Sequence, residues 1–176
     1  MGIKGTLNAL ESIYATYPIL LDDRIVYAIW FDGDYSGFNL TQSGEIAAFP
    51  SEAAAREFAI VLAKGLPIET TDLLNLDVCK KWMAKPSERS VKCSAFLRAY
   101  DAASDYRNSI ARANLDLGDK SHLRVLDKLF WGCNLPAVTP KGKSYIPIWT
   151  KKEVKELRTM LEESIAVFEA KLSIQV

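Results

Sequence analysis

Residues that carry catalytic chemistry are scarce in this sequence. The 176 residues include one histidine and three cysteines. Cys79, Cys93 and Cys133 lie far apart and form no CxxC pair, which argues against the recognised zinc and redox motifs. Any Ser–His–Asp or Cys–His arrangement would depend on His122 alone, and no G-x-S-x-G motif accompanies it. We therefore expect reduced, buried cysteines, a histidine at the surface or in a helix cap, and no catalytic residues.

Motifs for phosphate and metal binding are also missing. Neither G-x-x-x-x-G-K-[ST] nor a G-x-G-x-x-G after a strand occurs in the chain. The segment DGDYSG (32–37) begins like a calcium loop, but Ser43 stands where the closing bidentate carboxylate should be. We interpret the segment as a turn that is rich in Asp and Gly for backbone reasons. The sequence predicts no metal and no cofactor.

No apolar run approaches the roughly 18 residues that are needed to cross a bilayer. The first eighteen residues hold a single base, Lys4, and place Glu11 where a secretion signal would be apolar. The composition, 49% hydrophobic and 25% charged, is that of an ordinary globular protein. We expect one domain over 1–176, located in the cytoplasm, with no membrane partner.

The pattern of apolar residues predicts an α/β (α+β) fold, with a small antiparallel meander near the N-terminus packed against a mostly helical C-terminal half. RIVYAIWF (24–31) is short and dense in β-branched and aromatic residues, which is typical of a buried central strand. The turns at 32–37 and at Ser43-Gly44 extend it into a meander over 24–49. Six helices are expected: Thr6 to about Tyr14, Ser51–Gly65, 78–85, about 90–113, 122–131, and Thr150 to about Leu172. The expected N-caps are Ser51 for the second helix, Asp77 for the third and Ser121 for the fifth. A Thr150/Glu153 capping box is expected to begin the last helix.

Apolar positions also predict which side chains are buried. In the helix over 51–65 the expected buried face is Ala54, Phe58, Val61 and Leu62. The proline-rich segment 133–149 is expected to be an ordered, extended loop, pinned by Leu135, Tyr145, Ile146 and Trp149. We also assign Leu126, Phe130, Trp131 and Trp149 to the core.

Charge is unevenly distributed although the net charge is zero. Residues 1–60 hold three bases and eight acids, a balance of 3 − 8 = −5, and the remainder carries +5. An acidic face suits a basic protein partner and speeds the encounter with it. Aromatic residues accompany these acids at the end of the predicted strand, and aromatic side chains often anchor protein interfaces. We predict that a partner contacts Asp22, Asp23, Asp32, Asp34, Tyr35 and Glu45.

The stretch LDKLFWGCNLPAVTP (126–140), followed by YIPIW (145–149) and an acidic amphipathic last helix, resembles immunity proteins of bacterial contact-dependent growth inhibition systems. The segment VKCSAFLRAYDAASDYRNSI (91–110) is similar to the preceding helix of those proteins. The resemblance covers about 85 residues. It implies a non-enzymatic inhibitor that binds one cognate toxin C-terminal domain, commonly a nuclease, and covers its active site or a nearby exosite.

Two other functions remain open from the sequence. Lys141, Lys143, Lys151, Lys152 and Lys155, interleaved with Tyr145 and Trp149, form a cluster that suits a nucleic-acid backbone, although overall neutrality argues against direct nucleic-acid binding. Asp101 and Asp105, four residues apart on one helix, form the best candidate carboxylate pair for a small enzyme.

Overall fold

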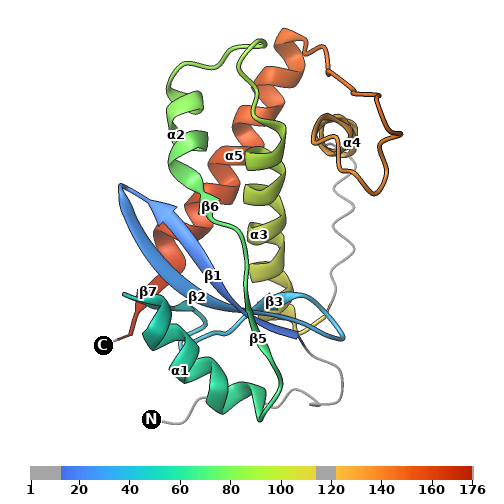
Figure 1. Ribbon diagram of the computed structural model, residues 1–176. Helices are drawn as coiled ribbons and strands as arrows, with labels where there is room; N and C mark the ends of the chain where they lie inside the picture. Colours follow the sequence, from blue (N-terminus) through green and yellow to red (C-terminus); the bar gives the residue numbers. More distant parts are fainter. Residues whose placement is uncertain (1–12, 114–121, 176) are drawn as a thin grey trace.

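The computed structural model describes residues 13–113 and 122–175, and it has the predicted α+β fold (Figure 1). A mixed sheet of seven strands is packed against helices on both of its faces. The strands are β1 (Ile13–Leu21), β2 (Arg24–Asp32), β3 (Gly37–Phe38), β4 (Ile46–Phe49), β5 (Ile68–Thr70), β6 (Leu74–Asn75) and β7 (Leu172–Ile174). The helices are α1 (Glu52–Ala63), α2 (Leu76–Ala84), α3 (Cys93–Ala111), α4 (Leu123–Gly132) and α5 (Lys151–Lys171).

The sheet is larger than the predicted meander. β2, β3 and β4 do pair antiparallel, as the turns between them predict. The strand order β5-β1-β2-β4-β7 adds β1 on one side and the C-terminal strand β7 on the other, while β3 pairs with β2 and β6 with β1. β7 runs parallel to β4, so the two halves of the chain share one sheet.

Strand β1 overturns part of the predicted first helix. Residues 6–12 of that helix lie outside the described residues, but Ile13 and Tyr14 belong to β1. In the sequence, Pro18 indicates a stop for that helix, but in the structure it lies inside the strand opposite Tyr27. On its other edge β1 pairs with β5 over residues 14–16 and with β6 over residues 19–20, so Pro18 falls where the neighbouring strand is interrupted. A proline is tolerated there because no bond to that neighbour is lost.

Two apolar clusters lie on opposite faces of the sheet. Under α1, Ala55, Ala59 and Ala63 pack on Ile29 and Phe49. The predicted burial of Val61 is wrong, since that side chain is 75% exposed. Ala54, Phe58 and Leu62 are half-buried at the edges of this cluster. The small alanines place α1 close against the sheet, and this closeness turns the larger residues outward.

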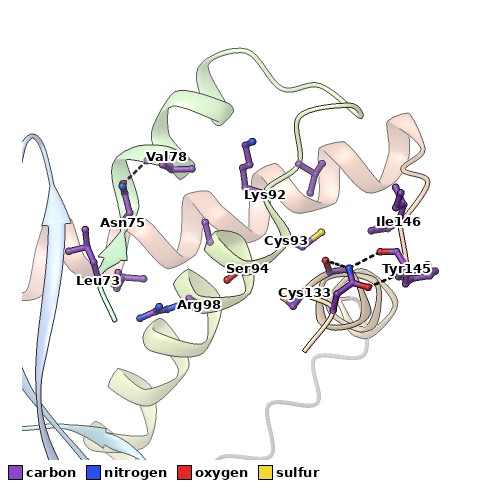
Figure 2. A pocket seen from close by; sticks show the side chains of 16 residues that line it. Leu73, Asn75, Val78, Lys92, Cys93, Ser94, Arg98, Cys133, Tyr145 and Ile146 are labelled. Atoms are coloured by element: carbon purple, nitrogen blue, oxygen red, sulfur yellow. Dashed lines mark hydrogen bonds between the residues drawn. The ribbon is translucent and has the colours of Figure 1, made fainter. Parts of the chain in front are cut away.

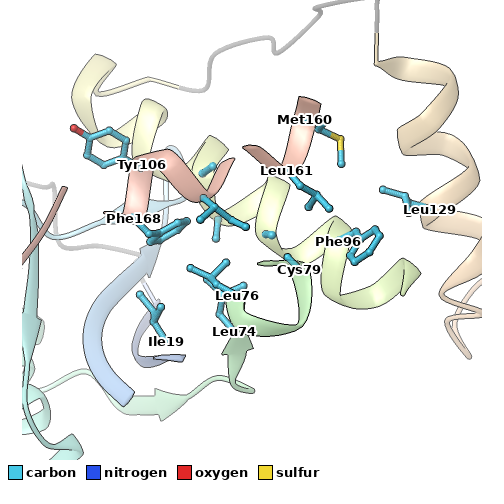
Figure 3. Close-up of a cluster of buried hydrophobic side chains, with 14 of the residues drawn as sticks. Ile19, Leu74, Leu76, Cys79, Phe96, Tyr106, Leu129, Met160, Leu161 and Phe168 are labelled. Carbon is cyan, nitrogen blue, oxygen red and sulfur yellow. The ribbon is translucent and has the colours of Figure 1, made fainter. Parts of the chain in front are cut away.

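The larger cluster packs α2, α3 and α5 on the other face of the sheet (Figure 3). Its fully buried members include Ile19, Phe38, Phe96, Leu161 and Phe168. The Thr150/Glu153 capping box of α5 and the Ser51 N-cap of α1 are confirmed. The N-cap of α2 is Asn75, not Asp77.

Helix α4 is packed differently from the prediction. Val125 and Leu129 are its fully buried residues, and Leu126 and Phe130 are half-buried. Trp131 is 43% exposed, so its assignment to the core is wrong. Its indole Nε1 donates to Asp127 on the outer surface of the helix. The Ser121 cap lies outside the described residues.

The segment after α4 is pinned by other residues than those predicted. Trp149 is buried as expected, but Leu135, Tyr145 and Ile146 are exposed. Asn134 fixes the segment instead: its amide donates to the Tyr145 carbonyl at 3.0 Å and accepts from the Tyr145 N–H at 2.6 Å. In the ranges 13–113 and 122–175, no helix is long and apolar enough to cross a membrane.

Candidate binding surfaces

Three of the predicted contact residues lie at the C-terminal end of β2. Asp34 is exposed, while Asp32 is half-buried and accepts a hydrogen bond from Ser36 at 2.9 Å. The Tyr35 ring stands nearly perpendicular to Phe31, with the ring centroids 5.3 Å apart. Since Phe31 belongs to the core, Tyr35 is held in place beside the two carboxylates and is not free to swing away.

Glu45 is brought to the same end of the molecule by helix α3. The turn that carries Glu45 is anchored where the Tyr106 hydroxyl donates to the Gly44 carbonyl at 3.1 Å. Burial, followed by the charge of Glu45, raises the pKa of Tyr106. We call Asp32, Asp34, Tyr35 and Glu45 the acidic end.

The start of β3 is docked on α3 just as closely. The Phe38 N–H donates to Ser109 Oγ at 2.6 Å. A β-carbon at Gly37 would lie 2.5 Å from that same oxygen, so only glycine fits at this position. The loop 32–36 and the turn 41–45 are therefore both fixed to the C-terminal half of one helix.

The carboxylate pair on α3 lies beside the acidic end. The Trp30 indole N–H donates to Asp105 at 2.8 Å. Burial raises the pKa of Asp105 to about 6, against the Trp30 hydrogen bond, which lowers it, and the Asp32 charge raises it further. Burial and the charge of Asp105 raise the pKa of Asp101 to about 6 as well, although Asp101 is partly open to solvent. Negative charge is therefore crowded at this end of the molecule.

Asp22 and Asp23 are separated from the other four. They form the tight turn between β1 and β2, both with positive φ. Their N–H groups donate to the Asp77 carboxylate at 2.8 and 3.0 Å, and the Asp22 carboxylate accepts from Lys80 at 2.8 Å. The nine residues of β2 span about 26 Å. The six predicted residues thus divide into two groups at opposite ends of this strand.

The lysine cluster of Lys141, Lys143, Lys151, Lys152 and Lys155 is exposed, but Trp149, one of its two predicted aromatic partners, is not. All five of its lysines are exposed, and Tyr145 is 42% exposed. Trp149 is buried under Lys128, whose Nζ lies 5.4 Å from the ring centroid, so Trp149 has no face available for base stacking.

A groove of about 660 Å³ separates α2 and the start of α3 from the segment after α4 (Figure 2). It is lined by Val78, Lys92, Tyr145 and Ile146 among others, and Cys93 and Cys133 lie on it too. Burial raises the pKa of both thiols, so neither is primed as a nucleophile. No sequence motif marks this groove, because its walls come from segments far apart in the chain.

The single histidine and the cysteines show no arrangement for catalysis or metal binding in the described part of the chain. His122 occupies the N-cap position of α4, with its Nδ1 at 3.5 Å from the Glu156 carboxylate, and its side chain makes no cap hydrogen bond. Cys79 is buried, as predicted, but the predicted burial of Cys93 and Cys133 is wrong, since both are only half-buried at the groove. In the part of the chain that the structure describes, no group of three or more His, Cys, Asp or Glu residues is placed to hold a metal ion.

Comparisons with known proteins locate a fold and no family. No protein-family model matches the chain, and a search of the curated proteins finds no relative. Among solved structures, the C-terminal domain of SatS, crystallised in complex with bromine, is similar, with a TM-score of 0.54. The match covers 92% of this chain and 94% of that one at 14% identity. The α+β arrangement therefore recurs in a solved protein, and at this identity the likeness extends to the fold alone.

Proposed function

We propose that this chain is an immunity protein, which binds a toxin domain of a contact-dependent growth inhibition system and neutralises it without catalysis. The observation that carries the proposal is the acidic end, where Asp34 lies close to a tyrosine whose ring is packed on Phe31, and where Asp32 and Glu45 lie on the two loops that α3 holds. An aromatic anchor among carboxylates suits a basic protein surface such as a nuclease cleft. The proposed site of action is the cytoplasm.

The rigid mounting of the acidic end supports a binding role. Its two loops are tied to α3 through Gly44 and Phe38, so little conformational entropy remains to be lost on association. Asp22 and Asp23 lie at the far end of β2. A partner bound at the acidic end would reach them only if its interface also covers the length of that strand.

The test uses the gene immediately upstream of the one that encodes this chain. We expect it to encode a secreted protein with a variable C-terminal domain. Co-expression of the chain with that domain should relieve its toxicity, and the two should co-purify as a one-to-one complex. If the two proteins do not associate and co-expression does not relieve toxicity, the proposal is overturned.

A small enzyme is the second candidate, because Asp101 and Asp105 both have a pKa raised to about 6, which suits general acid–base work near neutral pH. Asp101 also lines a groove of about 580 Å³ with Arg124 and Asp127. Hydrolysis of chromogenic esters, phosphates or glycosides that is lost in Asp101→Asn would favour this function. A toxin-binding protein is expected to hydrolyse none of them.

A further inference from the structure

The segment Tyr145–Ile148 holds two isoleucines in solvent. Ile146 is 81% exposed and Ile148 is 84% exposed, more than any other large hydrophobic side chain in the described part of the chain. Trp131, Leu135 and Val138, from α4 and the loop after it, are each more than 40% exposed as well. Isolated exposed apolar residues are ordinary, but apolar residues concentrated in one segment typically mark an interaction site.

This exposure is not a consequence of a loose backbone. Asn134 holds both the N–H and the carbonyl of Tyr145. Lys128 Nζ donates to the Ile148 carbonyl at 2.9 Å, and the next residue, Trp149, is buried. Between the isoleucines, the ring of Pro147 fixes one backbone dihedral and packs near Gly132. The chain is thus tied at both ends of the segment while its isoleucines point away from the core.

Along the chain, the stretch between Asp127 and Glu153 that holds this segment carries charge of one sign. Residues 128–152 contain five lysines and no aspartate or glutamate. Lys128 is paired with the buried Glu153, whereas Lys141, Lys143, Lys151 and Lys152 are exposed. The neighbouring groove is lined by Tyr145, Ile146 and Lys92, and no acidic residue lines it.

A further cation of the groove, Arg98, is already paired. Its guanidinium contacts Asp72, whose side chain is 93% exposed, at 3.3 Å. The unbalanced charge that an incoming group meets therefore comes from Lys92 and from the exposed lysines of the loop and the start of α5. It is positive.

We propose that Tyr145–Ile148 and the groove beside it form a docking surface for an acidic amphipathic segment of a partner protein. The isoleucines take the apolar side chains of that segment, and the lysines around them take its carboxylates. A nucleic acid fits less well, because Trp149 is buried and isoleucines offer no aromatic face to a base. A second copy that pairs symmetrically through this surface fits less well too, because two like-charged surfaces would face each other. The surface shares no residue with the acidic end, so the inference does not rest on the proposed function.

The test measures binding of labelled probes to the full chain by fluorescence anisotropy. The probes are an amphipathic peptide with leucines at helical spacing and glutamates elsewhere, the same peptide with lysine at every glutamate position, and a single-stranded DNA. The chain should bind the acidic peptide at least about tenfold more tightly than either of the others. Equal or tighter binding of the lysine peptide or of DNA would overturn the proposal.

Matched variants locate the binding. Ile146→Ser/Ile148→Ser should weaken binding of the acidic peptide at least about tenfold. The control Ile60→Ser/Val61→Ser changes two residues of α1 that are 57% and 75% exposed, and it should leave binding unchanged. Lys151→Gln/Lys152→Gln should weaken binding and reduce its dependence on salt. If the control variant weakens binding as much as Ile146→Ser/Ile148→Ser does, the assignment is contradicted. It is also contradicted if the wild-type chain sediments as a dimer and Ile146→Ser/Ile148→Ser sediments as a monomer.

Discussion

Glu153 ties the start of α5 to α4 through one buried carboxylate. Its oxygens accept from Thr150 N–H at 2.9 Å and from Lys128 Nζ at 2.7 Å, and Arg124 lies 3.5 Å away. Burial by itself would raise the pKa of Glu153, but the hydrogen bonds from Lys128 and Thr150 outweigh it and lower the pKa to about 2. The carboxylate is therefore held in its charged form.

We predict that Glu153→Ala lowers the free energy of unfolding by about 2–4 kcal/mol, because it removes half of the capping box and takes away the carboxylate that pairs with Lys128. The wild-type contribution should be fully present above the ordinary pKa of 4.5 and should be lost as the pH falls toward about 2. Urea unfolding at pH 7 and pH 3 measures both effects. Glu163→Ala, on an exposed face of α5, is the control. A difference between wild type and Glu153→Ala that is as large at the lowest pH as at pH 7 would contradict this account.

Asp105 should behave in the opposite way. Its pKa is raised from 3.8 to about 6 in the folded protein, so the folded state binds the proton more tightly than the unfolded chain. Ionising Asp105 therefore lowers the free energy of unfolding. This loss of stability is absent below pH 3.8, grows between pH 3.8 and about 6, and is complete above about 6. Asp105→Asn keeps an oxygen for the Trp30 indole and removes the charge.

We predict that Asp105→Asn raises the free energy of unfolding at pH 7 by about 1 kcal/mol and has little effect at pH 4. Thermal unfolding across that range measures the change. A variant that is destabilised equally at both values would show that the carboxylate is stabilised as an anion, contrary to this account.

At the scale of elements, the β1–β2 turn depends on a side chain from α2. The buried carboxylate of Asp77 accepts the N–H groups of Asp22 and Asp23, so it joins the end of the longest hairpin to the start of a helix. Sequence periodicity suggested Asp77 only as a cap for its own helix. The role that it has could not be predicted, because the turn lies more than 50 residues away.

We predict that Asp77→Ala lowers the free energy of unfolding by about 1–3 kcal/mol, because two N–H groups lose their acceptor. Hydrogen exchange should accelerate at Asp22 and Asp23 more than at the centre of β2. Asp72→Ala, whose side chain is almost fully exposed, serves as the control. Unchanged exchange at the turn would contradict the role assigned to Asp77.

The elements that sequence predicts well are those with local determinants. α1, α3 and α5 carry a cap or a long apolar stripe, and β2 carries a dense β-branched and aromatic run. β7 is three residues long and exists only because the distant strand β4 pairs with it. β5 and β6 lie in 66–76, a stretch whose sequence allows a short strand, but their pairing with β1 has no local signal. β1 was missed because Pro18 suggested a helix stop. The proline is tolerated inside the strand because it faces a gap between β5 and β6, and no local pattern reveals that gap.

At the scale of the whole molecule, the candidate sites were only partly predictable. Asp32, Asp34 and Tyr35 are neighbours in sequence, so their proximity follows from the turn. Glu45 joins them through α3, which no local pattern indicates. Ile146 was predicted to pin the loop 133–149, because apolar side chains favour the core, but Ile146 and its neighbour Ile148 are both exposed. Their exposure depends on hydrogen bonds from Asn134 and Lys128 that only the folded chain assembles.

The immunity proposal is tested most directly by the affinity of the chain for its cognate toxin domain, measured by calorimetry at two salt concentrations. Asp32→Asn/Asp34→Asn should weaken binding at least about tenfold and reduce its salt dependence. Tyr35→Ala should weaken it by about 2 kcal/mol or more. The matched control Glu57→Gln/Glu163→Gln removes two exposed carboxylates elsewhere and should bind like the wild type. Full affinity of Asp32→Asn/Asp34→Asn, or an equal loss in the control, would contradict the account.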